Sequence, residues 1–262
     1  MTRFERLFGS KKAIVGVIHL PPLPGYPTSP GIEKVVEKAL GDLEALEAGP
    51  VDGVLVENEE DRPHRVEAAR ETIAAMTRVA RELVRAARNA KIGVEILLND
   101  PQASLAAAAM AGASFIRTDY FVDPMERPEH GGPMRIDPEG LLQYRRSLGA
   151  DTMLILADVQ VKYARMLVER SLAESARLAR EAGADAVVVT GTKTGEPPSA
   201  AELEEARKGA GGIPVLVGSG LSSSNAGTLL SVADGAIVGT SLKRGDGIDP
   251  EKVRELLREV AR

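Results

Sequence analysis

The chain has 262 residues, which suits one large α/β barrel domain or two small domains, and its 44% hydrophobic content is ordinary for a globular protein. Its net charge of −5 argues against nucleic-acid binding through a basic surface, and the absence of cysteine excludes disulfides and thiolate metal sites and favours a cytoplasmic location. No apolar run approaches the roughly 20 residues of a transmembrane span. We therefore expect no nucleic-acid partner and no membrane span. Abundant Arg and Glu with few Asn and Gln is compatible with a thermophilic source.

Short apolar segments alternate with helix-length segments along the whole chain. The expected strands cover residues 13–19, 53–57, 92–98, 114–118, 153–157 and 186–190, and two more lie within 213–243. The expected helices cover residues 31–48, 65–90, 101–111, 137–148, 171–182, 199–208, 221–233 and 250–262. Each crossover is long enough for a parallel connection, so the order predicts a closed (β/α)8 TIM barrel as one domain over residues 1–262.

A doubly wound open sheet is the main alternative to the barrel. That fold usually carries its glycine-rich fingerprint after the first strand. Here a proline-rich loop follows the first strand, and the glycines follow the last three strands. The pattern therefore favours the barrel. The longest irregular stretch is expected at residues 120–136.

The last two expected strands end in clusters of small residues, and these predict an anion site. The clusters are Gly218-Ser219-Gly220 and Gly239-Thr240-Ser241, with a serine-rich helix start between them. Backbone amides of such turns bind phosphate, and phosphate sites after strands seven and eight recur in TIM barrels. A lone Gly-Ser-Gly is weak evidence, because glycines also end strands for turn geometry. Two consecutive clusters favour a phosphate cup, with a small phosphorylated molecule or phosphate as the partner.

The other strand ends carry acid, base or amide groups. Because TIM-barrel active sites lie at the carboxyl ends of the strands, we expect catalytic groups there. The candidate catalytic residues are His19, Glu57, Asp119, Asp158 and Lys162, and the candidate substrate-binding residues outside the two clusters are Asn99, Arg117, Gly191 and Thr192. The same carboxylates fit a divalent cation, so Mg²⁺ stays open as a cofactor, with no residue assigned as a metal ligand. His19 fits a structural role in the following loop equally well, and Lys162 fits a solvated loop lysine.

Alternation along two neighbouring strands places charges inside the barrel. Glu95 and Arg117 each lie in mid-strand, where a charge is costly unless paired, so we expect both to point inward and to pair with each other. Whether that pair is structural or contacts substrate stays open. Lys193 fits a loop lysine better than a Schiff-base nucleophile. His64 and His130 are expected in solvated loops.

The opening motif Val15-Gly-Val-Ile-His-Leu-Pro-Pro-Leu-Pro-Gly-Tyr-Pro resembles the signature of the BtpA family, also called the photosystem I biogenesis or SgcQ-like family. Further matching segments are 51–58, 72–77, 98–100, 113–117, 155–164 and 184–198. The resemblance covers nearly the whole chain and implies a ribulose-phosphate-binding type of TIM barrel. It implies little about the reaction: one branch is linked to photosystem I assembly, and others are called nucleosidases or phosphoribosyl isomerases.

The chain departs from the family pattern at two strand ends. The third strand ends in Glu95-Ile-Leu-Leu-Asn-Asp, whereas family members usually have a sequence similar to Asn-x-Leu-Arg-Asn-Asp at this strand end. The fourth ends in Arg117-Thr-Asp, where the family resembles Arg-Val-Asn followed by a His-Thr-Gly-like turn. These differences put the substrate in doubt, and a photosystem role is not carried over.

The sequence is compatible with three functions. An enzyme that acts on a small phosphorylated substrate, by isomerisation, lyase chemistry or N-glycosidic cleavage, fits best. A non-catalytic assembly factor would need a large exposed apolar patch outside the mouth. A Mg²⁺-dependent hydrolase would need several oxygen ligands that converge. Homo-oligomer contacts through the proline-rich loop or the segment 131–132 also stay open.

Overall fold

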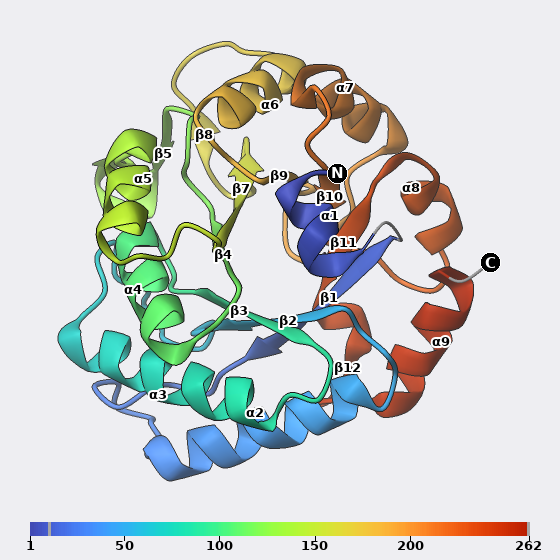
Figure 1. The fold of residues 1–262 in the computed structure, drawn as a ribbon. Coiled ribbons are helices and arrows are strands. Elements are labelled where there is room, and N and C mark those ends of the chain that lie inside the picture. The colour runs from blue at the N-terminus through green and yellow to red at the C-terminus, as the bar shows by residue number, and fades with distance from the viewer. Residues whose placement is uncertain (10–11, 261–262) are drawn as a thin grey trace.

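Eight parallel strands close into a barrel in the order β1-β11-β10-β9-β7-β4-β3-β2, as seen in a computed structural model that describes residues 1–9 and 12–260 (Figure 1). The barrel strands are β1 (Ala13–His19), β2 (Gly53–Glu57), β3 (Lys91–Glu95), β4 (Phe115–Thr118), β7 (Leu154–Val159), β9 (Ala186–Val189), β10 (Val215–Val217) and β11 (Gly235–Val238). The (β/α)8 fold expected from the sequence is confirmed.

The helices form an outer ring around the strands (Figure 1). They are α2 (Ile32–Glu47), α3 (Arg70–Ala86), α4 (Pro101–Ala111), α5 (Pro138–Ser147), α6 (Leu172–Glu181), α7 (Ala200–Ala210), α8 (Ala226–Val232) and α9 (Pro250–Val260). Local signals explain where several of them begin. Asp100 and Asp137 cap α4 and α5 by accepting hydrogen bonds from backbone N–H groups, and proline occupies the first helical position of each.

Four predicted boundaries were wrong. Helix α3 runs from Arg70 to Ala86 rather than over residues 65–90, and strand β3 ends at Glu95 rather than at residue 98. Helix α8 begins at Ala226 rather than at residue 221. The reason for the last difference is local, because the Asn225 side chain accepts a hydrogen bond from the N–H of Ser222 and closes a turn there.

The barrel interior is apolar toward the amino-terminal ends of its strands. The inward side chains of this part include Val15 of β1, Leu55 of β2 and Phe115 of β4. Helix α1 (Arg3–Phe8), which was not predicted, lies across this end of the barrel (Figure 1). Its Phe8 ring lies 5.7 Å from the ring of Phe115. Over the described residues, α1 therefore covers the amino-terminal end of the barrel.

Gly93 of β3 is required by the ring of Phe115. A Cβ atom at Gly93 would lie 2.1 Å from the nearest ring carbon, and Phe115 is fully buried. Gly93→Ala is therefore expected to lower the free energy of unfolding by about 1–3 kcal/mol through overpacking. Urea unfolding measures this. The control Gly41→Ala lies on the exposed face of α2 with no atom near the added methyl, and it should raise stability by about 0.5–1 kcal/mol. Equal effects of the two substitutions would contradict the packing described here.

A small antiparallel sheet covers one side of the barrel mouth. It consists of β5 (Met125–Arg127), β6 (Gly132–Pro133) and β8 (Arg165–Met166), with the short helix η1 (Pro128–His130) between the first two. The expectation of an irregular segment over residues 120–136 was therefore wrong. We call these three strands the rim sheet. On another part of the mouth, the helix η2 (Thr240–Leu242) leads into the hairpin β12 (Lys243–Arg244) and β13 (Gly247–Ile248).

No helix within residues 1–9 and 12–260 is both long and apolar enough to cross a membrane.

Candidate active site

A cavity of about 430 Å³ occupies the carboxyl ends of the barrel strands. Its lining joins both halves of the site expected from the sequence. The sequence-predicted residues that line it are His19, Glu57, Arg117, Asp119, Lys162, Gly218, Ser219, Gly220, Gly239 and Thr240. The acid/base side and the glycine-rich side therefore face one shared space. Of the remaining predicted residues, Asn99, Asp158, Gly191, Thr192 and Ser241 do not line it.

The glycine-rich side is built from the three loops after β9, β10 and β11, which serine side chains tie together. The Ser219 hydroxyl accepts from the N–H of Gly191 at 2.9 Å and donates to the carbonyl of Glu196 at 2.6 Å. The Ser241 hydroxyl donates to the carbonyl of Leu221 at 2.6 Å. Gly191 and Ser241 thus position the loops instead of facing a ligand. Thr192 is exposed and donates a hydrogen bond to Glu196.

Gly220 lets the loop after β10 lie close to the backbone of the loop after β9. Its φ of +68° lies in the left-handed region, and a Cβ atom there would lie 2.2 Å from the backbone nitrogen of Pro197, so glycine is required. In the part of the chain that the structure describes, the N–H groups of Gly220 and Thr240 donate to no loop or turn acceptor. Residues 218–220 and 239–240 lie where the sequence predicts phosphate binding, and we call them the phosphate cup. The serines at 222–224 lie outside it and bond within the turn or to Glu255.

A buried ionic layer forms the floor of the cavity. Arg117 donates two parallel hydrogen bonds to the carboxylate of Asp158, at 2.8 and 2.9 Å. Its Nη1 lies 3.4 Å from Glu57 Oε1 and 3.6 Å from Glu95 Oε2. The expected inward pairing of Glu95 and Arg117 is confirmed, but Asp158 is the stronger partner. Asp158 is buried beneath the cavity and holds Arg117, so it acts on a ligand only through that residue.

Three carboxyl groups contact this single guanidinium and the charge of Arg117 also acts on Asp119, so the four carboxyl groups do not all ionise equally. Burial raises the pKa of Glu95 well above its usual value, and neither of its oxygens accepts a hydrogen bond from a described residue. Burial and then the charge of Asp158 raise the pKa of Asp119 to about 6. Burial also opposes ionisation of Glu57, but His19 and Arg117 outweigh it and lower its pKa. Asp119 is therefore a base with a pKa suited to proton transfer near neutral pH, and the raised pKa of Glu95 favours its protonated form.

His19 bridges the ionic layer and the hairpin. Its Nε2 lies 3.5 Å from Glu57 Oε2, and its Nδ1 faces the ammonium of Lys243. Burial, with the charge of Lys243, lowers the pKa of His19 although Glu57 opposes this. The lysine donates to Nδ1, which places the proton of the neutral imidazole on Nε2, toward Glu57. Lys243 was not predicted as part of the site, because nothing in its local sequence indicates a contact with β1.

Other cavity residues were also missed. They come from loops whose packing has no local sequence signal, and they include Glu59, Arg62, His64, Glu129, Tyr163, Thr194 and the rim-sheet residue Arg127. Burial and then the charge of Glu57 raise the pKa of Glu59 to about 7. His64 was expected in a solvated loop, but it lines the cavity, with Nε2 3.1 Å from the carbonyl oxygen of Glu59.

Two further predicted residues lie away from the cavity. The Asn99 side chain donates to the carbonyl of Arg135 at 2.9 Å. Lys193 is exposed and forms an ion pair of 2.9 Å with Glu196, an arrangement that does not suit a Schiff-base nucleophile. Among the residues the structure describes, no three His, Asp or Glu side chains are arranged to hold a metal ion.

A model of the BtpA family matches residues 10–262. The chain belongs to the BtpA family. It is 38% identical over 263 residues to the photosystem I biogenesis protein BtpA of Synechocystis, a match that covers 97% of this chain and 90% of that relative. Family membership agrees with the motifs of the first strand and its proline-rich loop.

Solved structures with the same fold are TIM-barrel enzymes of the ribulose-phosphate-binding type. One is (S)-3-O-geranylgeranylglyceryl phosphate synthase from Thermoplasma acidophilum in complex with sn-glycerol-1-phosphate, with a TM-score of 0.65, 16% identity and coverage of 99% of this chain and 98% of that chain. Another is N-(5'-phosphoribosyl)anthranilate isomerase from Pyrococcus furiosus, with a TM-score of 0.58, 17% identity and coverage of 95% and 98%. At these identities the likeness establishes the fold alone.

Proposed function

We propose that this BtpA-family protein is an enzyme that moves a proton within a small phosphorylated substrate, as an isomerase or lyase for a sugar phosphate or phosphoribosyl compound. One observation carries the proposal: the phosphate cup and the acid/base carboxyls line the same cavity. The phosphorylated compounds in the names of the two structural neighbours are in keeping with it.

Each part of the site has a role in this proposal. The N–H groups of Gly220 and Thr240 bind the phosphate and anchor the substrate. Asp119, whose pKa is about 6, accepts a proton from the far end of the substrate, and Glu95, whose raised pKa favours the protonated form, donates one. Arg117 stabilises negative charge that develops between them. With a base and an acid on one side of the mouth, side chains of this chain can relocate the proton.

A non-catalytic assembly role is the second candidate, and the name of the Synechocystis relative is the observation that favours it. An assembly role would need a binding surface for a partner protein outside the barrel mouth. An assembly factor would tolerate substitution of the cavity residues, whereas an enzyme requires them.

Ligand-induced stabilisation tests the proposed function. Inorganic phosphate, glycerol 3-phosphate and ribose 5-phosphate, each at 100 times its dissociation constant, should stabilise the fold by about 2.7 kcal/mol and raise the Tm by about 5–10 °C. Ribose and chloride at matched ionic strength should not. Thermal shift measures this.

Gly239→Ala is the matched variant for that experiment. A Cβ atom at Gly239 would lie 3.3 Å from the ring of His19, a contact that a small shift of the ring relieves, and the added methyl takes up space in the cavity beside the cup. We expect the variant to lose most of the phosphate-dependent stabilisation and to keep the Tm of the free protein within a few degrees. An unchanged Tm of the natural protein with every phosphate compound would contradict the proposed function.

A further inference from the structure

The rim sheet presents a cation to the side of the mouth opposite the phosphate cup. In the closed strand order, β3 and β4 lie across the barrel from β10 and β11, whose loops form the cup. Arg127 ends β5, in the segment that follows β4, and it lines the same cavity as the cup residues. A ligand bound at the cup and extended across the mouth therefore meets this guanidinium.

Arg127 is poorly neutralised for a buried cation. Its side chain is 11% exposed, and within the described chain its Nε is buried without a hydrogen-bond partner. The nearest carboxylate is that of Glu129, 3.8 Å from Nε, on a side chain that is 56% exposed and so held weakly. A buried guanidinium is costly unless it is paired and hydrogen-bonded. Glu129 therefore neutralises Arg127 only weakly, and an anionic group of a ligand would pair with the guanidinium better.

Tyr163 holds the guanidinium in a defined place. The Cζ of Arg127 lies 5.4 Å from the centre of the Tyr163 ring, a cation–π contact. The Tyr163 hydroxyl accepts a hydrogen bond of 2.8 Å from the N–H of Thr194, which fixes the ring. Lys162, the neighbour of Tyr163, lines the same cavity and adds a second positive charge.

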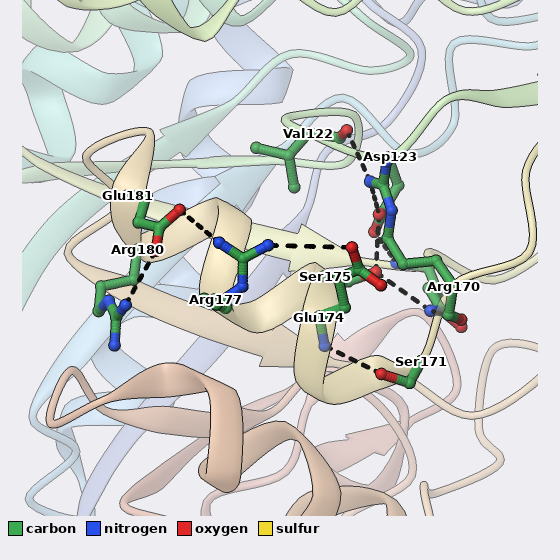
Figure 2. A network of polar contacts seen from close by, with 10 residues as sticks. Val122, Asp123, Arg170, Ser171, Glu174, Ser175, Arg177, Arg180 and Glu181 are labelled. Atoms are coloured by element: carbon green, nitrogen blue, oxygen red, sulfur yellow. Dashed lines mark hydrogen bonds and ion pairs between the residues drawn. The ribbon is translucent and has the colours of Figure 1, made fainter.

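The segment that leads into the loop of Lys162 and Tyr163 is anchored by the buried carboxylate of Asp123, which belongs to the polar network in Figure 2. The Asp123 carboxylate accepts hydrogen bonds from Arg170 at 2.9 Å, from Ser175 at 2.7 Å and from the N–H of Gln160 at 2.8 Å. The pairing of β8 with β5 ties the other end of the loop to the strand of Arg127. The cation and its aromatic support are therefore preorganised, as a binding site requires.

We propose that the substrate carries a second anionic group, a carboxylate or a second phosphate, which binds Arg127 at the rim while the first phosphate occupies the cup. This inference rests on the proposed function and narrows its substrate class to compounds with an anion at each end. The planar guanidinium suits either group, since both accept two parallel hydrogen bonds. The reacting carbons then lie between the anions, over Asp119 and Glu95.

A matched pair of ligands tests the second anion. Glucitol 6-phosphate and 6-phosphogluconate share a six-carbon skeleton and differ in a hydroxymethyl group against a carboxylate. Titration calorimetry should show that the natural protein binds 6-phosphogluconate about ten- to a hundredfold more tightly, the range expected for a hydrogen-bonded charge pair. Glucitol 1,6-bisphosphate distinguishes a carboxylate from a phosphate as the second anion. If the protein prefers only this ligand over glucitol 6-phosphate, the group bound by Arg127 is a phosphate, which also supports the proposal.

Variants of Arg127 test whether this residue causes the preference for ligands with a second anion. Arg127→Met should abolish it and leave the affinity for glucitol 6-phosphate within about twofold, and Arg127→Lys should retain part of it. The control Arg146→Met removes the same charge from the exposed face of α5 and should change neither affinity. Equal affinity of the natural protein for all three ligands would overturn the second anion site and leave the phosphate cup intact. Binding of none of them, nor of inorganic phosphate, would instead overturn the proposed function.

Discussion

Replacing Asp119 with asparagine is expected to lower the turnover number by about 10²- to 10⁴-fold, the usual contribution of a general base. Asp119 faces the cavity, and its pKa of about 6 leaves it mostly ionised at neutral pH and still able to accept a proton. Asparagine keeps the shape of the side chain but cannot take up the proton. The affinity for inorganic phosphate, which binds at the cup, should stay within about twofold of the original.

The pH dependence of turnover distinguishes this role from a structural one. A base must be deprotonated to act, so the rate should rise with pH through about 6 and then level off. That rise should disappear in the asparagine variant. The exposed Asp151 offers a control, because Asp151→Asn removes a similar charge outside the cavity and should leave the profile unchanged. Full activity of the Asp119 variant, on the substrate that a phosphate-compound screen identifies, would contradict the assignment.

Arg117→Met is expected to have the largest effect on stability, a loss of about 3–5 kcal/mol in the free energy of unfolding. The guanidinium is buried and bonds to the Asp158 carboxylate through two hydrogen bonds while contacting Glu57 and Glu95. Methionine fills much of the volume but leaves these carboxyl groups buried without their cation. Urea unfolding, monitored by circular dichroism, measures the loss.

An exposed ion pair provides the comparison. Arg177 pairs with Glu181 on the surface of α6, at 2.6 Å (Figure 2), and both side chains are about half exposed. Arg177→Met should cost about 0.2–1 kcal/mol, because solvent screens such pairs. A loss for Arg117→Met no larger than this would mean that the ionic layer is not the buried, coupled unit described here.

Much of the architecture follows from patterns that are local in the sequence. Buried parallel strands appear as short apolar runs, and the alternation of residues along them is sufficient to place Glu95 and Arg117 inside the barrel. Asp100 and Asp137 precede prolines and cap helices for the reason that the sequence indicates. The expectation that functional residues lie at the carboxyl ends of the strands correctly predicted that His19, Asp119 and residues of both glycine clusters line one cavity.

The remaining features depend on contacts between segments far apart in the chain. Lys243 contacts His19, and Arg127 stacks on Tyr163, and each of these contacts joins segments that no local sequence pattern relates. The same expectation placed Asp158 at the mouth. It could not show that the Asp158 carboxylate bonds to Arg117 and is buried away from the cavity. That distinction depends on the depth of each strand in the barrel, which register fixes and residue type does not.

A crystal structure of the protein grown with saturating inorganic phosphate tests the central claim most directly. We expect an anion within hydrogen-bond distance of the N–H groups of Gly220 and Thr240, on the cavity side of both loops. The Gly239→Ala variant, crystallised under the same conditions, should hold no anion there. An empty cup in the natural protein, or an anion found only outside the cavity, would contradict the account.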